Sequence, residues 1–348
     1  MKIAIHDRKG SFSDHWIEYC KKNDIEYKIV NAYDSDIVEQ VKDCDAFMWH
    51  HHQTNYKDVL FAKQLLFSLQ QAGKIVFPDL NTGWHFDDKL GQKYLFEAHG
   101  IKAARSWAFY DKKSAYRWIE ETSFPKVFKL RGGAGSANVM LAKSASDAKK
   151  FVRKAFGKGF PQYRGRDYVK ESYRQYKANH KTLLAFLRSC GRLIIPNQFT
   201  RMHGPEKGYV YFQEFIPNEG CDYRVTIVGE KAIAFKRLTR KNDFRASASG
   251  LPIWEDKLVD IDIIKQAFQT SKKLKTQTIS IDIVFSQKNY EPYIIEVSFG
   301  YGFPQIAGEN QPNSPNGFWT SDLVYHIENT FSPIIWMIES VVNEFENK

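Results

Sequence analysis

Two apolar strand patterns near the C-terminal end of the chain are each interrupted by a single acid. Asp282 lies within the sequence SIDIV, and Glu296 lies within IEVS. If the two strands form a hairpin that turns about Asn289, the two acids are equally far from the turn and face each other. Like charges in opposed positions destabilise a sheet, so a cation is expected between them. The pattern therefore predicts an antiparallel hairpin that binds a cation.

Mg²⁺ is the natural candidate for this cation, because it prefers oxygen ligands and commonly shares them with substrate phosphates. Ser298 lies two residues beyond Glu296 and so shares its face of the strand. The alternative is that one acid is a buried, hydrogen-bonded residue and the other is exposed. That alternative leaves the matched positions of Asp282 and Glu296 unexplained.

Residues 1–84 alternate apolar strand patterns with helical patterns, which is typical of a small parallel α/β domain. Strands are expected at Lys2–His6, Glu26–Val30, Ala46–Trp49 and Lys74–Phe77, and helices at Asp14–Asn23 and Val59–Ala72. Three histidines, His50, His51 and His52, follow the third strand. Consecutive side chains diverge, so we expect a loop there without a metal ion.

A second lobe is expected over residues 85–208. An aspartate within the sequence FDDK can cap a helix that runs to about His99, and Gly100 fits its end. Further helices are expected at Ser114–Thr122, Ser146–Phe156 and near His180–Ser189. The rest of residues 157–208 is a basic insertion without a clear pattern.

A glycine-rich loop follows an apolar strand in this lobe. The segment 131–136 reads RGGAGS, and glycines let backbone amides approach phosphate oxygens closely. The loop lacks the ending of a Walker motif, and a strand pattern at Val139–Ala142 follows it where a dinucleotide fold would need a helix. It therefore resembles the tip of a hairpin, with Lys129 just before the tip. An ordinary turn beside a lysine that reaches water is the equally weighted alternative.

Residues 209–348 are predicted to form a third lobe. Strands are expected at Tyr209–Phe215, Tyr223–Val228, Lys231–Phe235, Thr278–Phe285 and Tyr293–Val297, with a closing helix around Ser321–Phe345. Asp222, Arg224 and Thr226 share one strand face, where a simple salt bridge is the alternative interpretation. Arg237 and Arg245 follow, so several cations can converge on a polyphosphate.

The composition restricts the class of protein. The formal charge of +10 and the pI near 9.2 favour anionic partners such as nucleotides or acidic glycans. No apolar run approaches the ~20 residues that span a bilayer, and a strand beginning at Lys2 leaves no room for a signal peptide. We therefore expect a cytoplasmic protein without a membrane partner. The four cysteines lack a CxxC pair, which argues against a disulfide framework or a thiolate zinc site.

The order of these parts resembles the ATP-grasp fold over roughly residues 86–302. The resemblance is greatest to ribosomal-protein glutamate ligases and glutathione-synthetase-like enzymes. The shared motifs are a QEFI hinge at 213–216, a D-x-R strand at 222–224, and a KR-to-FR stretch from 236 to 245. The resemblance implies a mixed α/β and α+β chain: an ATP-grasp fold preceded by a small parallel α/β (pre-ATP-grasp) domain.

The resemblance also implies roles for individual residues. Lys89 and Lys129 correspond to lysines that bind ATP phosphates, under a mobile loop that contains Gly132, Gly133, Gly135 and Ser136. The hinge residues Glu214, Phe215 and Ile216 correspond to the adenine contact, and Asp222 to the ribose contact, with Glu219 as the alternative. Arg224, Arg237 and Arg245 correspond to catalytic cations. Asp282, Glu296 and Ser298 correspond to ligands of two Mg²⁺ ions.

Two positions depart from the pattern of these relatives. Ser298 stands where the relatives usually have asparagine, and Ser247 similarly replaces an expected asparagine. A hydroxyl is a smaller and weaker ligand, so the second Mg²⁺ would depend mainly on Glu296 and phosphate. The segment 299–304 also diverges and is expected to shape the acceptor site.

The predicted activity is an ATP- and Mg²⁺-dependent ligase that joins a carboxylate to an amine through an acylphosphate. The carboxylate would belong to a small molecule, a glycan or a peptide, and a homodimer is compatible with the sequence. Three alternatives remain: an ATP-binding regulatory protein with weakened turnover, another ATP-dependent phosphotransferase on the same fold, and a nucleic-acid-binding module. The last would need basic residues interleaved with base-stacking aromatics on one surface, which the sequence does not single out.

Overall fold

The computed structural model describes residues 1–132, 138–161, 169, 172–173, 176–177, 182–191, 198–239, 252–304, 306–311 and 313–348. These residues form two compact units. Unit 1 contains Met1–Gln53, Lys57–Ala104 and Ile216–Lys348, and unit 2 contains Thr54–Tyr56 and Arg105–Phe215. Within the described residues, no helix has the length and apolar character needed to cross a membrane.

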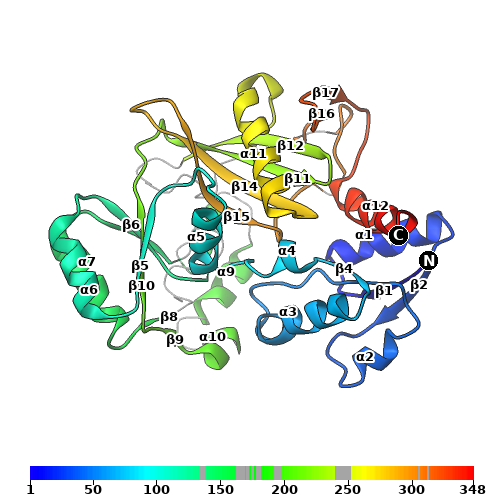
Figure 1. Ribbon diagram of the computed structural model, residues 1–348, viewed down its shortest axis with the longest axis horizontal. Helices are drawn as coiled ribbons and strands as arrows, with labels where there is room; N and C mark the ends of the chain where they lie inside the picture. The colour runs from blue at the N-terminus through cyan, green and yellow to red at the C-terminus, as the bar shows by residue number, and fades with distance from the viewer. Residues whose placement is uncertain are drawn as a thin grey trace. The chain divides into compact units, whose positions relative to one another are not determined.

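The N-terminal part of unit 1 is a four-stranded parallel sheet (Figure 1). Its strands are β1 (Lys2–His6), β2 (Glu26–Val30), β3 (Ala46–Met48) and β4 (Ile75–Phe77), in the order β2-β1-β3-β4. Its helices are α1 (Phe12–Lys22), α2 (Ile37–Gln40), α3 (Tyr56–Gln71) and α4 (Leu80–Gly83). The predicted parallel α/β arrangement is confirmed.

Alternating side chains of β1 bury this sheet on both faces. Ile3 and Ile5 pack with α1 and with the C-terminal helix α12 (Pro333–Glu346). Ala4 lies in a separate core with residues of β3 and α3. The parallel strands therefore sit between two helical layers, as parallel sheets require.

The second part of unit 1 is a larger, antiparallel sheet. Its strands are β11 (Cys221–Val228), β12 (Lys231–Leu238), β13 (Pro252–Ile253), β14 (Thr278–Phe285), β15 (Pro292–Ser298), β16 (Gly317–Thr320) and β17 (Tyr325–Ile327). Helix α11 (Ile261–Leu274) covers one face, where Val225, Ile227, Ile281 and Ile283 form the core with Ile264. A short 3₁₀ helix (Asp256–Leu258) precedes α11, and α5 (Lys89–Ala98) packs beside β15.

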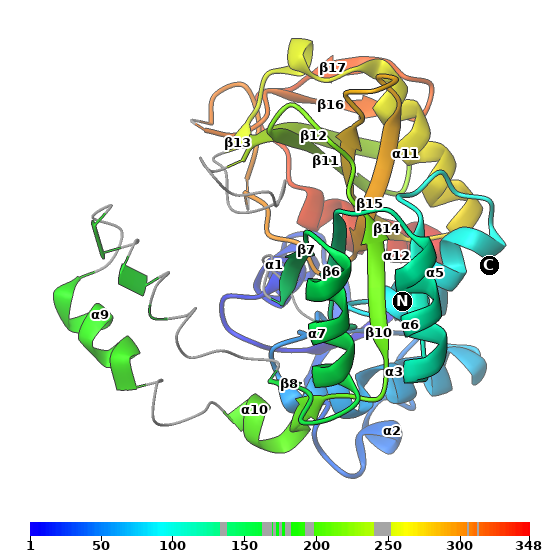
Figure 2. The same cartoon turned by 90° about the vertical axis from the view of Figure 1, so that its left-hand side faces the viewer.

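Unit 2 is built on the antiparallel sheet β5-β10-β6-β7, and its helices lie in front of this sheet in Figure 2. The strands are β5 (Ser106–Phe109), β6 (Lys126–Lys129), β7 (Val139–Ala142) and β10 (Val210–Glu214). Helices α6 (Lys112–Glu121) and α7 (Ala145–Ala155) share a core with Phe128 and Phe212. The remaining described elements are β8 (Phe160–Pro161), α9 (Leu183–Cys190), α10 (Gln198–His203) and β9 (Pro205–Glu206).

The predicted closing helix was too long. Helix α12 begins only at Pro333, and β17 lies within the segment that was predicted to be helical. Proline is favoured in the first turn of a helix because its missing N–H has no partner there, and it disfavours a helical residue before it. Residues 321–332 therefore leave the helix and include a strand at the edge of the sheet.

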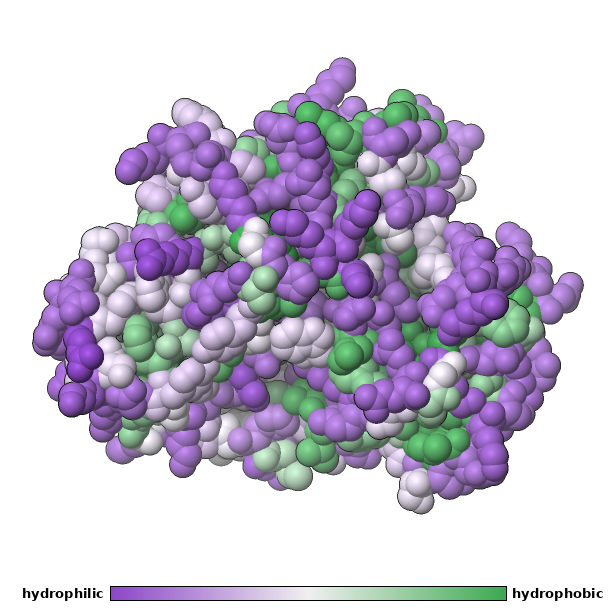
Figure 3. Space-filling view, viewed as in Figure 1, coloured by the Kyte–Doolittle hydropathy of each residue, from purple (hydrophilic) through white to green (hydrophobic). Residues whose placement is uncertain are grey.

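The surface shown in Figure 3 is mainly hydrophilic, and its hydrophobic residues lie in small separate groups. The exposed hydrophobic side chains include Leu60 on α3, Leu80 on the short helix α4, and Tyr290 in the turn before β15. Isolated apolar side chains of this kind are normal on protein surfaces. Functional residues are therefore better sought among buried polar groups.

Candidate nucleotide and metal site

The two acids predicted to face each other are paired in the structure. Strands β14 and β15 run antiparallel with Asp282 opposite Glu296 and Ser280 opposite Ser298. This part of the predicted register is confirmed. Directly opposed residues of an antiparallel pair lie on the same face, so these four side chains share one side of the hairpin.

Nearer the turn, the predicted register was wrong by one residue. Ile283 pairs with Ile294 and Phe285 pairs with Pro292, so Ile295 is an extra residue on β15. It forms a bulge, in which two residues of one strand face one residue of its partner. The turn is therefore not symmetrical about Asn289. The extra residue in β15 brings Glu296 back opposite Asp282.

The face that carries the acids extends across β11 and β12. Arg224 on β11 lies opposite Asp282, and Asp222 lies opposite Arg237 on β12. We call this surface the polar sheet face. It comprises Asp222, Arg224, Thr226, Arg237, Ser280, Asp282, Glu296 and Ser298. The opposite face is apolar and packs on α11.

Two arginines bind the carboxylate of Asp282. Arg224 donates from Nε to Oδ1 at 2.7 Å and from Nη2 to Oδ2 at 2.9 Å. Arg237 Nη2 lies 3.0 Å from Oδ1 of the same carboxylate. Paired donors of this kind match the planar fork of a carboxylate and fix its orientation.

Arg237 also binds Asp222. Its Nε lies 2.9 Å from Asp222 Oδ1, and its Nη2 donates to Asp222 Oδ2. Asp222 has no exposed surface, whereas the Arg224 side chain is 23% exposed. Asp222 is thus enclosed against Arg237, while Arg224 is the member of this group that reaches solvent. We call Asp222, Arg224, Arg237 and Asp282 the arginine–aspartate cluster.

The charges in this cluster balance. Burial opposes ionisation of Asp282, but Arg224 and Arg237 outweigh it and hold the pKa of that carboxyl well below its usual value. Burial and the charge of Asp282 raise the pKa of Asp222 to about 6, against the effect of Arg237. Burial alone would lower the pKa of Arg237, but Asp282 and Asp222 raise it. Removing one member would leave a buried charge without compensation, which is costly.

Glu296 has a different partner, Lys89, which is the first residue of α5. Lys89 Nζ lies 3.1 Å from Glu296 Oε1 and 3.6 Å from Asp87 Oδ1. Asp88 caps the helix by accepting a hydrogen bond from the amide of Gly91, so the predicted capping by this acidic pair is confirmed. The Lys89 side chain is 4% exposed and that of Glu296 is 29% exposed. Glu296 is therefore the more accessible of the two acids.

Helix α5 is tied directly to the backbone of β15. Gln92 donates from Nε2 to the carbonyl of Val297 at 2.8 Å, and its Oε1 accepts from the Val297 amide. Gln92 is buried, so both bonds lie away from water. This pair of bonds fixes the position of Lys89 relative to Glu296.

Other predicted residues lie in unit 2, except Ile216, which is the first residue of the last segment of unit 1. Lys129 ends β6, is 6% exposed and pairs with Val139 across the hairpin that leads to the glycine loop. Glu214 ends β10, and its amide donates to the carbonyl of Arg105 at 2.7 Å. Phe215 and Ile216 follow it, between β10 and β11, and the Ile216 carbonyl accepts from Asn218 Nδ2.

Part of the predicted site lies outside the described residues. This applies to Gly133, Gly135, Ser136 and Arg245, whereas Gly132 is the last described residue before the gap. The hairpin that should present the glycine loop is confirmed by the antiparallel pairing of β6 with β7.

Sequence reasoning missed Lys126. Its Nζ lies 3.0 and 2.9 Å from the two carboxylate oxygens of Glu214, and 5.2 Å from the centre of the Trp107 ring. Lys126 is only 2% exposed. The sequence did contain a signal for this ion pair. Lys126 and Lys129 interrupt the apolar pattern of β6, and Glu214 ends the apolar pattern of β10. Opposite charges in neighbouring strands can pair.

A cavity of about 420 Å³ opens on the α11 side of the sheet. Its lining includes Glu219, Tyr223, Lys257, Phe285 and Tyr290. Tyr223 and Phe285 belong to the face of β11 and β14 opposite to the polar sheet face. Glu219 is exposed, in contrast to the enclosed Asp222.

No family model matches the sequence, and no curated protein matches it. Solved structures do match. The D-alanine–D-alanine ligase of Bacillus anthracis, complexed with ATP, is 15% identical, with 100% of this chain and 98% of that chain covered and a TM-score of 0.55. A RimK domain ATP-grasp protein from Sphaerobacter thermophilus is 15% identical, with 87% and 92% covered and a TM-score of 0.51.

A third similar structure is the ATP-grasp ligase PsnB, complexed with a minimal precursor, Mg and ADP. It is 13% identical, covers 98% of each chain and has a TM-score of 0.52. The RimK domain protein and PsnB are ATP-grasp proteins, and PsnB and the D-alanine–D-alanine ligase are ligases bound to adenine nucleotides. Each of the three matches most of the chain. At these identities the similarity concerns the fold. The chain has the ATP-grasp fold.

Proposed function

We propose that the protein is an ATP- and Mg²⁺-dependent ligase that joins a carboxylate to an amine. The observation that carries the proposal is the pairing of Asp282 with Glu296 on a strand face that also bears Arg224 and Arg237, with Lys89 in contact. Two acids beside three cations match the needs of a metal–polyphosphate complex. The ATP-grasp ligases of similar fold support the reaction class.

The residues present fit a magnesium ion. Asp282 and Glu296 supply hard carboxylate oxygens, and Ser298 adds a hydroxyl that now donates to the Gly300 carbonyl. Mg²⁺ at this position would neutralise phosphate charge and orient the terminal phosphoryl group. Glu296 would carry most of the binding of a second ion, because a hydroxyl is the weaker ligand.

Nucleotide binding would change the partners of the arginine–aspartate cluster. The carboxylate of Asp282 is already bound by Arg224 and Arg237. A polyphosphate offers Arg224 a new anionic partner and so frees Asp282 oxygens for the ion. Arg224 is the more exposed of the two arginines and is therefore proposed to make this exchange.

The remaining positions have proposed roles that follow from the ATP-grasp resemblance. Lys129 and the loop from Gly132 would bind the phosphates, and the backbone of Glu214 and Ile216 would meet adenine. Because Asp222 is enclosed against Arg237, we propose that it positions Arg237 and that Glu219 contacts the ribose. Arg245 would complete the cationic site.

The proposed reaction proceeds in two steps. A carboxylate oxygen of the substrate attacks the terminal phosphorus of ATP, the bond to ADP breaks, and an acylphosphate forms. The amine nitrogen then attacks the acyl carbon, phosphate leaves, and the nitrogen loses a proton to give an amide. Arg237 and Lys89 would stabilise charge on the transferred group, so catalysis rests on positioning and electrostatics.

The variant Glu296→Gln tests this proposal. It keeps the shape of the side chain but removes a charged ligand, so ADP release should fall at least about a hundredfold. Glu291→Gln is the matched control, because Glu291 lies in the turn of the same hairpin and is exposed. Circular dichroism would check that both variants fold. Wild-type ADP release by Glu296→Gln, in a screen of acids with amines, would contradict the assignment.

A further inference from the structure

The parallel sheet of unit 1 has a point where its connections diverge. The chain leaves β1 through α1 to β2 on one side, and leaves β3 through α3 to β4 on the other. In open α/β sheets, ligands bind beyond the carboxyl ends of the strands at such a point. We call residues 7–11 after β1 and residues 49–52 after β3 the carboxyl edge.

Side-chain contacts join the two segments of the carboxyl edge. Ser11 Oγ lies 2.8 Å from His50 Nδ1. The rings of Phe12 and His50 stack with centroids 3.7 Å apart and 5° between their planes. The start of α1 and the segment after β3 therefore form one surface.

Arg8 supplies a positive charge to this surface. Within the part of the chain that the structure describes, no carboxylate lies within salt-bridge distance of its guanidinium, and its only hydrogen bond runs from Nη2 to Ser11 Oγ at 3.4 Å. The nearby acids have other partners. Asp7 accepts from Ser13, and Asp58 accepts from the Tyr33 hydroxyl and the His52 amide.

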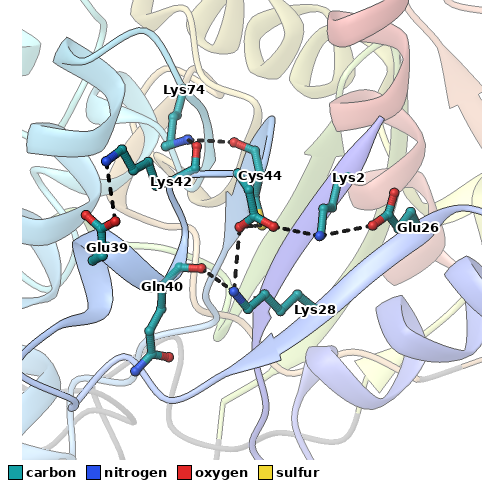
Figure 4. Close-up of polar contacts among 9 residues, drawn as sticks. Lys2, Glu26, Lys28, Glu39, Gln40, Lys42, Cys44 and Lys74 are labelled. Atoms are coloured by element: carbon teal, nitrogen blue, oxygen red, sulfur yellow. Dashed lines mark hydrogen bonds and ion pairs between the residues drawn. The ribbon is translucent and has the colours of Figure 1, made fainter.

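The opposite, amino-terminal edge of the same sheet shows the contrast (Figure 4). There, Lys2 lies 2.7 Å from Asp43 and 3.0 Å from Glu26, and Lys28 lies 3.6 Å from Asp43. Lys2 and Lys28 at that edge are thus paired with acids. Among the described residues, Arg8 at the carboxyl edge forms no salt bridge of the kind that these two lysines make at the other edge.

The three histidines at this edge are uncharged near neutral pH. Burial and the charge of Arg8 lower the pKa of His50 to about 3. Burial also lowers the pKa values of His51 and His52, with Arg8 among the contributing charges. Arg8 therefore provides the fixed charge, and the imidazoles can act as neutral donors or acceptors.

One buried polar atom of this edge lacks a hydrogen-bond partner among the described residues, and the start of α1 has no side-chain cap. His51 is 3% exposed, and its Nε2 atom is buried without a hydrogen bond. Ser11 occupies the N-cap position of α1 but makes no capping hydrogen bond with its side chain, which contacts His50 instead. Buried polar atoms are normally satisfied, so an unpaired one calls for a ligand or water. A helix start favours anions, and the first turn of α1 already carries one, Asp14, which accepts from the Gly10 amide.

The carboxyl edge adjoins the end of the strand that carries Glu296. Phe299 directly follows Ser298, and its ring lies 4.9 Å from that of His51 and 6.4 Å from that of His50. Gly300 comes next, and a Cβ there would lie 2.5 Å from the Phe86 ring. The chain that follows β15 is therefore packed tightly against Phe86 and lies beside His51.

We propose that the carboxyl edge binds a carboxylate group of the acid substrate, with Arg8 as the specificity-determining residue. This inference rests on the proposed ligase function. The guanidinium fork matches the two oxygens of a carboxylate, and the start of α1 adds favourable polarity. The neutral histidines make the surface around Arg8 suited to an organic acid.

The experiment measures binding of glutarate, a small dicarboxylate, in the absence of nucleotide. NMR signals of the histidine side chains and calorimetry would be followed in the wild-type protein, in Arg8→Gln and in Lys9→Gln. Lys9 is the neighbouring exposed cation and serves as the matched control. Glutarate should shift the His50 and His51 signals in the wild type and in Lys9→Gln. The dissociation constant in Arg8→Gln should be at least tenfold higher.

Three outcomes would overturn the inference: no glutarate response in the wild type, equal binding by Arg8→Gln, or an equal response to the neutral diamide of glutarate. Preferential binding of inorganic phosphate would show a general oxyanion site and would also contradict it. Calorimetry with a nonhydrolysable ATP analogue separates this test from the proposed function. Arg8-dependent glutarate binding without any nucleotide binding would refute the ligase and leave the carboxylate site standing.

Discussion

Arg237 binds two buried carboxylates, those of Asp222 and Asp282, and it binds Asp222 through more of its atoms. Asp222 is fully enclosed and engages both Nε and Nη2 of Arg237, whereas Asp282 is bound through Nη2 and also by Arg224. Because Asp222 has no exposed surface, its effect on a ligand must act through Arg237. Asp222 is therefore a positioning residue in the proposed mechanism.

The variant Asp222→Asn should lower both stability and turnover. It leaves one buried positive charge without compensation, which costs about 3 kcal/mol of unfolding free energy. Turnover should fall at least about tenfold, while the KM for ATP changes less, because the transferred phosphoryl group loses a correctly placed cation. Urea unfolding and steady-state kinetics would measure the two effects.

Asp262→Asn is the control for this variant, since Asp262 is exposed on α11. It should change neither quantity by more than a small amount. If Asp222→Asn raised the KM for ATP strongly with an unchanged kcat, Asp222 would instead contact the nucleotide directly, as the ribose assignment requires.

At the scale of elements, apolar strand patterns made several strands predictable. The bounds of β1, β2 and β14 match the predicted ranges, and β11 begins two residues before its predicted start. β1, β11 and β14 bury several apolar side chains, so their patterns have few competing interpretations. Helices α5 and α7 were also predicted. Asp88 caps α5, whereas α7 is capped by Ser144 and begins at Ala145, one residue before its predicted start at Ser146.

The β15 bulge was not predictable from the sequence. Ile295 is apolar like its neighbours, and its extra place in the strand depends on the pairing with β14 and on the conformation of the turn. Helix α11, in contrast, was missed although its signals are present: Asp260 caps it, and Ile263, Ile264 and Ala267 follow a helical spacing. Sequence patterns indicate which elements exist, but strand irregularities depend on tertiary contacts.

The candidate site was predicted only in part, because most of its contacts depend on how distant parts of the chain meet. The opposed acids could be found because both interrupt apolar strands. The partners of those acids could not, because Arg224 reaches Asp282 across 58 sequence positions, and Lys89 reaches Glu296 from a different element. Arg8 carried no motif, and only the folded chain shows that it forms no salt bridge with the acids among the described residues.

For the whole molecule, the buried histidines predict sensitivity to acid. Burial lowers the pKa values of His50 and His85 to about 3 and about 4, below the ordinary 6.5. The folded chain therefore resists protonation, whereas the unfolded chain accepts protons below about pH 6.5. The stabilisation is complete above that pH and is lost as the pH falls, by about 1.4 kcal/mol per pH unit for each such histidine.

Urea unfolding at pH 7, 6 and 5 would measure this loss. The variant His85→Leu should reduce the dependence on pH, and His99→Gln, a change at an exposed histidine, should leave it unchanged. A free energy of unfolding that stays constant between pH 7 and pH 5 would show that these histidines do not control acid stability.

The most direct test of the account measures divalent metal binding, with Mn²⁺ in place of Mg²⁺, by electron paramagnetic resonance. Asp282 is bound by Arg224 and Arg237, so Mn²⁺ alone should bind weakly. A nonhydrolysable ATP analogue should tighten binding at least tenfold. Asp282→Asn and Glu296→Gln should abolish this gain, and Glu291→Gln should preserve it. Equally tight nucleotide-dependent Mn²⁺ binding by Asp282→Asn and Glu296→Gln would contradict the central claim that these two opposed acids hold the ion.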